Sequence, residues 1–168
     1  MQRLTKSLAI PTVAQTSRYL AYLEDAYVVF ALPRFTSSFR QRVVAPNKYY
    51  AVDNGLRRAN SPSTPDRGHR LENAVFLALR RGRERVAYAA EKDLWECDFV
   101  TEAEAVQVCA ELTPDNRDRE LRGVVRAATL PGGKRQRLVL TLAQRDRLDV
   151  EGVRVDVEPA WEWLSRRG

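Results

Sequence analysis

The stretch LWECDFVTEAEAVQVCAEL, Leu94–Leu112, decides the fold of this chain. Two largely apolar runs, 94–100 and 105–112, flank the polar segment TEAE, a pattern typical of two strands joined by a short turn. The first run carries Asp98, and the second carries Gln107 and Cys109. Because Gln107 and Cys109 are two residues apart, a strand places their side chains on one face. The pattern indicates either an ordinary strand pair or a strand pair that carries a site.

Periodic segments on both sides predict the rest of an α/β (α+β) domain. An apolar stripe at Leu71, Val75, Ala78 and Leu79 predicts a helix, and Gly82 suits its C-terminal cap. Another helix is expected to begin near Pro114. Further strands are predicted over 85–90, 137–142 and 153–159, and a short helix over 160–167. The run 137–142 is apolar, which favours a central strand. The predicted order is α-β-β-β-α-β with a mixed sheet.

The first 60 residues predict a different unit. Thr12 is a good N-cap, and Val13, Thr16, Leu20 and Leu23 follow at helical spacing. Strands are expected over 26–32 and 48–53, on either side of the basic stretch PRFTSSFRQRVVAPN. A helix followed by a strand, a basic loop and a second strand is the winged-helix plan.

A winged helix offers two surfaces for DNA. The helix can lie in a major groove, and the basic loop, or wing, can hold phosphates. The residues expected to contact DNA are Gln15, Arg18, Tyr22, Arg40 and Arg42. An equally open interpretation is a docking adaptor that binds a partner protein and contacts no DNA.

Charge is distributed unevenly along the 168 residues. Residues 1–60 carry nine Lys/Arg and three acidic residues, whereas 61–168 carry 19 of each, so the whole net charge of +6 lies in the first part. A basic module beside a neutral one favours contact with polyanions, although a soluble surface with a basic bias would look the same. The Pro- and Ser-rich segment NSPSTPDRGHR predicts a linker. We therefore expect two units, 1–60 and 61–168.

Other properties of the sequence bear on the expected cellular location. The sequence shows neither a secretory signal nor an apolar run of the roughly 20 residues that a membrane span requires. The two cysteines, Cys97 and Cys109, then read as reduced thiols. The expected location is the cytoplasm, with no membrane contact.

Acidic residues on the predicted α-β-β-β-α-β core suggest a known chemistry. The core of the PD-(D/E)xK nuclease superfamily has this order, with a Glu on the first helix, an Asp on the second strand and Glu-x-Lys on the third. In this chain Glu72 lies on the helix, Asp98 on the second strand, and Gln107 and Cys109 at the Glu and Lys positions. Hard carboxylate oxygens bind Mg²⁺, which activates water and clamps a scissile phosphate.

Several segments together resemble one prokaryotic family. LAIPTVAQTSRYLAYLEDAYVVFALPRF, KYYAVDNGL, LENAVFLALRRG, ECDFV, VQVCAEL and PAWEWL are similar to the C-terminal region, called DUF4143, of a group of AAA-type ATPases. That resemblance covers essentially the whole chain and implies a winged helix, then a PD-(D/E)xK-like domain, with an ATPase as a partner. No G-x-x-x-x-G-K-[ST] motif occurs, so this chain carries no ATP site.

The departures from the nuclease pattern decide the expected activity. Gln107 removes one ligand charge, and Cys109 supplies no ammonium near the transition state. Glu96 is an additional carboxylate candidate, and Lys92 a candidate replacement for the missing lysine. We expect a DNA-binding, nuclease-like module that does not cleave, with Glu72 and Asp98 at most a weak Mg²⁺ or Mn²⁺ site. The alternatives are a protein–protein adaptor and an active metal-dependent nuclease.

Overall fold

The structure, a computed structural model, describes residues 2–36, 38, 45–60, 66–82 and 85–167. Helices in these ranges are α1 (Gln2–Ser7), α2 (Val13–Asp25), α4 (Asn54–Asn60), α5 (Arg67–Arg81), α6 (Pro114–Ala128) and α7 (Ala160–Ser165). Strands are β1 (Val29–Leu32), β2 (Lys48–Ala51), β3 (Ala87–Glu91), β4 (Trp95–Val100), β5 (Glu104–Val108), β6 (Gln136–Thr141), β7 (Asp146–Val150) and β8 (Val153–Pro159). None of these helices has the length and apolar character needed to cross a membrane.

The main sheet has six strands in the order β3-β4-β5-β6-β8-β7. Strands β5, β6 and β8 run parallel, and the remaining pairs are antiparallel, so the sheet is mixed. This confirms the predicted mixed α/β class and the central place of the 137–142 run. Strand β7 was not predicted; it pairs with β8 through a tight turn at Glu151 and Gly152, both with positive φ.

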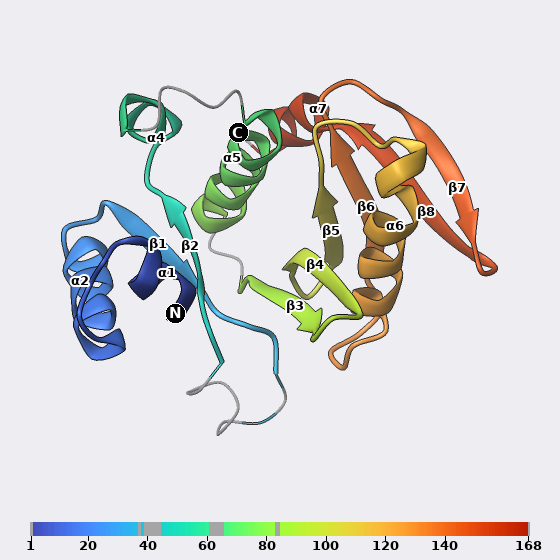
Figure 1. The fold of residues 1–168 in the computed structure, drawn as a ribbon. Helices are drawn as coiled ribbons and strands as arrows, with labels where there is room; N and C mark the ends of the chain where they lie inside the picture. Colours follow the sequence, from blue (N-terminus) through green and yellow to red (C-terminus); the bar gives the residue numbers. More distant parts are fainter. Residues whose placement is uncertain (1, 37, 39–44, 61–65, 83–84, 168) are drawn as a thin grey trace.

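Helices cover both faces of this sheet (Figure 1), and each face has its own apolar core. On one face Phe76 and Leu79 of α5 and Trp163 of α7 pack against Phe99 and Leu138. On the other face α6 packs against β4, β5 and β6. The two faces together remove most apolar side chains of the sheet from water, which is the main stabilising term of such a layered fold.

Strands β1 and β2 form a separate antiparallel ribbon, seen beside α5 in Figure 1. Leu32 of β1 and Tyr50 of β2 are buried in the same apolar core as Phe76 and Phe99. Beyond β1 the chain forms a parallel bridge between Arg34 and Tyr88 at the free edge of β3. The β1–β2 ribbon and the six-stranded sheet therefore share one hydrophobic core.

Two expected boundaries are wrong. The segment 60–70 is not a continuous linker, because α4 extends to Asn60 and α5 begins at Arg67. The Asp66 side chain caps α5 by accepting from the His69 amide at 3.1 Å. Strand β5 ends at Val108, four residues before the end of the predicted run, where the chain turns toward α6.

The predicted buried face of α2 is only partly covered. Thr12 caps the helix as expected, accepting from the Gln15 amide at 3.1 Å. Thr16 is buried and shares a hydrogen bond with Thr5 of α1. Val13 and Leu23, expected on the same buried face, are 39% and 41% exposed. The short α1 and the narrow β1–β2 ribbon are too small to cover the whole helix.

Candidate functional site

An ammonium group lies among three carboxylates at one side of the main sheet. The Nζ atom of Lys48 is 2.6 Å from Glu96 Oε1, 3.0 Å from Asp98 Oδ1 and 3.6 Å from Glu72 Oε1. These four residues line one open cleft of about 1080 Å³. The sequence pattern predicts the carboxylates as site residues but not Lys48, because the strand of Lys48, KYYAVD, carries no motif of a functional site.

Three elements position these four side chains. Lys48 begins β2, Glu72 lies in α5, and Glu96 and Asp98 lie in β4. Ala87 pairs with Val100 and Ala89 with Cys97, so the β3–β4 register shifts by one residue at Asp98 and Phe99. A bulge of this kind re-aims a side chain and is frequent beside functional sites.

Further hydrogen bonds fix the orientation of two carboxylates. The Tyr50 hydroxyl, two residues along β2 from Lys48, donates to Glu72 Oε1 at 2.6 Å. The backbone amide of Val108 on β5 donates to Asp98 Oδ2 at 3.0 Å. Each carboxylate is therefore held by a second group besides Lys48, as expected for polar groups that are largely out of water.

Burial and charge shift the pKa values of this cluster. Burial raises the pKa of Asp98 to about 7, and repulsion from Glu72 adds to it, although Lys48 opposes the shift. Burial alone would lower the pKa of Lys48, but Asp98, Glu72 and Glu96 together hold it above its usual value. Both pKa values are raised, which favours the charged form of Lys48 and the neutral form of Asp98. Lys48 interacts with three carboxylates, whereas Asp98 shares a single ammonium with two other acids. The ammonium is therefore the firmly charged member of the cluster.

The two residues at the expected Glu and Lys positions face another neighbour. Gln107 Nε2 donates to Glu120 Oε2 at 2.5 Å, and Gln107 Oε1 accepts from the Asp98 amide at 3.2 Å. Cys109 is 8% exposed, and burial raises the pKa of its thiol to about 12, with Glu120 adding to the shift. Glu72 and Asp98 thus meet at Lys48, whereas the side chains of Gln107 and Cys109 are directed to α6.

The cluster does not fit a divalent metal ion. Mg²⁺ needs several oxygen ligands at about 2.0–2.1 Å in octahedral geometry. One Asp98 oxygen accepts from Val108 and the other contacts Lys48, and the Gln107 oxygen accepts from a backbone amide. Across the ranges that the structure describes, no group of three His, Cys, Asp or Glu side chains is placed to hold a metal ion. Lys92 lies on the rim of the cleft, and Lys48 instead contacts the carboxylates.

The predicted DNA-contacting residues are placed only in part. Arg18 and Tyr22 are exposed on α2, and Gln15 is half-buried with its amide donating to the Tyr19 hydroxyl at 2.7 Å. Arg40 and Arg42 lie outside the described residues. The exposed surface of α2 is rich in tyrosine and leucine, and Arg18 is the single basic residue of the helix.

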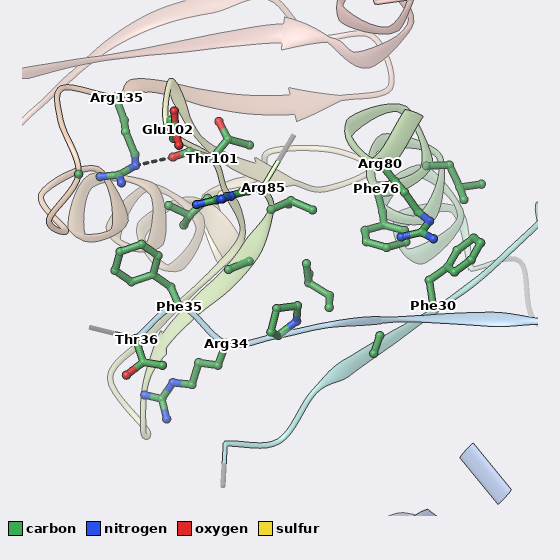
Figure 2. Close-up of a pocket in the computed structure, with 18 of the residues that line it drawn as sticks. Phe30, Arg34, Phe35, Thr36, Phe76, Arg80, Arg85, Thr101, Glu102 and Arg135 are labelled. Atoms are coloured by element: carbon green, nitrogen blue, oxygen red, sulfur yellow. Dashed lines mark hydrogen bonds between the residues drawn. The ribbon is translucent and has the colours of Figure 1, made fainter. Parts of the chain in front are cut away.

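A pocket lined by arginines lies where the β1–β2 ribbon meets the main sheet. Figure 2 shows Arg80 of α5 at one end of this pocket, and Arg85 and Arg135 at the other. Its volume is about 1250 Å³. It is lined by the basic residues Arg34, Arg80, Arg81, Arg85 and Arg135, the rings of Phe30, Phe35 and Phe76, and the carboxylate of Glu102. We call it the arginine pocket.

The arginines of this pocket differ in how they are held. Arg135 is 5% exposed and donates to the carbonyls of Thr101, Leu130 and Pro131. The Arg80 guanidinium lies 3.7 Å from the centre of the Phe30 ring, in cation–π contact. Arg81 and Arg85 are exposed. The pocket therefore combines the exposed guanidinium groups of Arg81 and Arg85 with the buried, hydrogen-bonded guanidinium group of Arg135.

Arginines at the far edge of the sheet are charge-balanced by contrast. They form five salt bridges with neighbouring acids: Arg145–Glu162, Arg147–Asp156, Arg154–Asp156, Arg166–Glu158 and Arg167–Glu104. In the described part of the chain, no salt bridge involves an arginine of the arginine pocket. No local sequence pattern predicts the arginine pocket, because its arginines come from four separate segments of the chain.

Comparisons with known proteins find a family model and two relatives with similar sequences. Residues 2–67 match the model of a domain of unknown function, DUF8612. The chain is 30% identical over 159 residues to an uncharacterized protein of Methanocaldococcus jannaschii, covering 86% of this chain and 35% of the relative. It is 34% identical over 113 residues to an uncharacterized protein of Haemophilus influenzae, covering 64% and 28%.

The extent of these matches bears on the site. The chain spans about a third of the length of the curated relatives it matches. The matching model includes Lys48 and Tyr50 but ends before the carboxylates of α5 and β4. No solved structure matches the chain.

Proposed function

We propose that this chain is a DNA-binding module with a nuclease-like but non-cleaving core, working with an ATPase partner. The arginine pocket is the single observation that carries DNA binding. Five arginines and one carboxylate line it, whereas arginines at the far edge of the sheet are matched by acids. A cleft with one sign of charge concentrates polyanions, and guanidinium groups bind phosphate oxygens through paired hydrogen bonds.

The nuclease-like part of the proposal is supported by the order of elements. Helix α5 is followed by β3, β4, β5, α6 and β6, with Glu72 on the first helix and Asp98 on the second strand. The winged-helix part is supported by α2 and the β1–β2 ribbon. The ATPase partner rests on the sequence resemblance alone.

Charge reversal at the arginine pocket tests DNA binding. Arg81 and Arg85 are exposed, so R81E/R85E should fold normally and weaken binding of labelled DNA at least about tenfold at moderate salt. Arg122 and Arg126 are exposed on α6 outside the pocket, so R122E/R126E makes the same charge change as a matched control. Fluorescence anisotropy measures both. Equal affinities in the two variants would refute the pocket as the contact surface.

A second set of variants tests the predicted winged-helix surface. R18A/R40A/R42A removes the basic residue of α2 and two of the three arginines between β1 and β2, and it keeps Arg34 of the arginine pocket. If this variant loses affinity and R81E/R85E does not, DNA lies along α2 and the loop. If both lose affinity, the nucleic acid contacts both sets of arginines.

The protein–protein adaptor remains the second candidate, because α1 and α2 expose large apolar side chains. Tyr22 and Tyr27 are 58% and 71% exposed, and the exposed set also includes Leu4, Leu8, Val13, Tyr19 and Leu23. Contiguous exposed apolar surface marks protein interfaces, and tyrosine is enriched there. If Y22S/L23S abolishes cross-linking to an ATPase identified by mass spectrometry, and wild type binds no DNA, the adaptor is favoured.

A further inference from the structure

We propose that the ammonium of Lys48 is the resident cation of the Glu72–Glu96–Asp98 cluster and excludes divalent metal ions from it. The inference concerns the carboxylate cluster and does not depend on DNA binding at the arginine pocket. It assigns a role to a lysine that comes from the β1–β2 ribbon, outside the α5–β6 unit that carries the carboxylates.

The number of carboxylates in ion-pair contact with Lys48 equals the number of N–H donors of its ammonium. A lysine side chain has three N–H donors, and three carboxylates lie within 3.6 Å of Nζ. A divalent ion bound by the same oxygens would lie about 2 Å from each and within a few ångströms of Nζ. Repulsion between the two cations in a half-buried cleft would be strong. The cluster therefore has room for one of the two cations.

Lys48 is held in place by its own strand. Tyr50, on the same β2, is 7% exposed and donates to Glu72. The Tyr88 hydroxyl donates to the carbonyl of Pro46, two residues before Lys48. The Lys48 ammonium also lies 5.5 Å from the centre of the Tyr88 ring. Anchors on both sides of Lys48 keep its side chain directed at the carboxylates.

The remaining groups near the cluster are engaged elsewhere. Gln107 bonds to Glu120 and to the Asp98 amide, so it does not add an oxygen beside Glu72. Asp98 uses its second oxygen for the Val108 amide. A metal ion entering the cluster would have to displace Lys48 from its three carboxylates. The arrangement thus favours the ammonium over an ion from solution.

Manganese titration followed by electron paramagnetic resonance tests the proposal. Up to about 1 mM Mn²⁺, the full chain is expected to show no saturable site that depends on Asp98, so Asp98→Asn should give the same titration curve. This concentration exceeds the dissociation constants of the high-affinity cation sites of proteins. Lys48→Met removes the ammonium and keeps an unbranched apolar side chain, so it should gain one Mn²⁺ site. Lys48→Arg keeps the charge and should gain none. The site gained in Lys48→Met should disappear in K48M/D98N.

Two outcomes would overturn the proposal: a wild-type Mn²⁺ site that needs Asp98, or folded Lys48→Met that binds no Mn²⁺. Circular dichroism checks that each variant is folded. A second measurement uses the unmodified chain, so its result does not depend on whether Lys48→Met folds. The ¹³Cε resonance of Lys48, assigned by its loss in Lys48→Arg, should not move when Mg²⁺ is added. A shift that saturates with Mg²⁺ would show that the ion displaces the ammonium.

Discussion

The Lys48 ammonium and the Asp98 carboxylate lie 3.0 Å apart, although 50 positions separate them in the chain. This contact joins the β1–β2 ribbon to the bulged strand β4. It also sets the electrostatics of the cleft, because one ammonium serves three carboxylates. The stability of the fold should therefore depend on pH in a way that Asp98 controls.

We predict that stability falls as pH rises from about 4 to about 7, and that Asp98→Asn reduces this slope. The folded-state pKa of Asp98 is about 7, above the ordinary value of 3.8. In this range the folded chain holds a proton that the unfolded chain has lost, so unfolding becomes easier by up to about 1.4 kcal/mol per pH unit. Urea denaturation at several pH values measures the slope. Identical slopes in both proteins would contradict the prediction.

Tyr50→Phe should lower the free energy of unfolding by about 1.5–3 kcal/mol, the range for a hydrogen bond to a charged group. The Tyr50 hydroxyl donates to Glu72 at 2.6 Å, and the ring is buried, so water does not readily replace the lost donor. Tyr27→Phe is the matched control, because Tyr27 is 71% exposed and its hydroxyl meets solvent. Denaturant midpoints that shift equally in the two variants would refute the role of Tyr50.

Gly123→Ala in α6 should be strongly destabilising. A Cβ atom at Gly123 would lie 1.9 Å from the Glu96 carbonyl oxygen, a clash with backbone that no rotamer relieves. The clash outweighs the roughly 1 kcal/mol by which alanine improves a helix over glycine. In Gly68→Ala the new Cβ meets no atom within 4 Å, so this α5 variant should be neutral or slightly more stable. Thermal unfolding should show shifts of opposite sign, and similar shifts would count against this packing.

We predict that the chain does not nick DNA with Mg²⁺ or Mn²⁺. Lys48 lies among the carboxylates, so the cluster offers no site for a metal ion. Gln107 and Cys109 are directed to α6, so no lysine stands at the position where the nuclease pattern has one. Supercoiled plasmid and single-stranded DNA are the substrates. Nicking by wild type that vanishes in Asp98→Ala would establish an active nuclease, and nicking that persists in the variant would come from a contaminant.

Local signals in the sequence were sufficient for most elements of the main sheet. The stripe from Leu71 to Leu79 and the apolar run 137–142 predicted a helix and a central strand, because periodicity reports which face is buried. Helix α4 was missed because it buries no residue and has no apolar face. Strand β7 was missed because its outward residues are charged and its run is short.

The site was less predictable than the fold, since it depends on contacts between distant segments. Glu72 and Asp98 were found from their residue types and their places on predicted elements. Lys48 was not, because only the packing of β2 against α5 brings it to the carboxylates. The arginine pocket likewise gathers residues from β1, α5, β3 and the loop before β6, and no local pattern connects them.

The bridge between Arg34 and Tyr88 has a consequence for self-association. An unpaired edge strand is a template for other chains, and β3 would be such an edge in the main sheet. The chain after β1 occupies it: the Phe35 amide donates to Tyr88, and the Tyr88 amide donates to Pro33. The opposite edge, β7, instead presents Asp146, Arg147 and Asp149 to solvent. Backbone pairing thus covers one edge of the sheet, and charged side chains line the other. Both features disfavour edge-to-edge pairing of copies into aggregates.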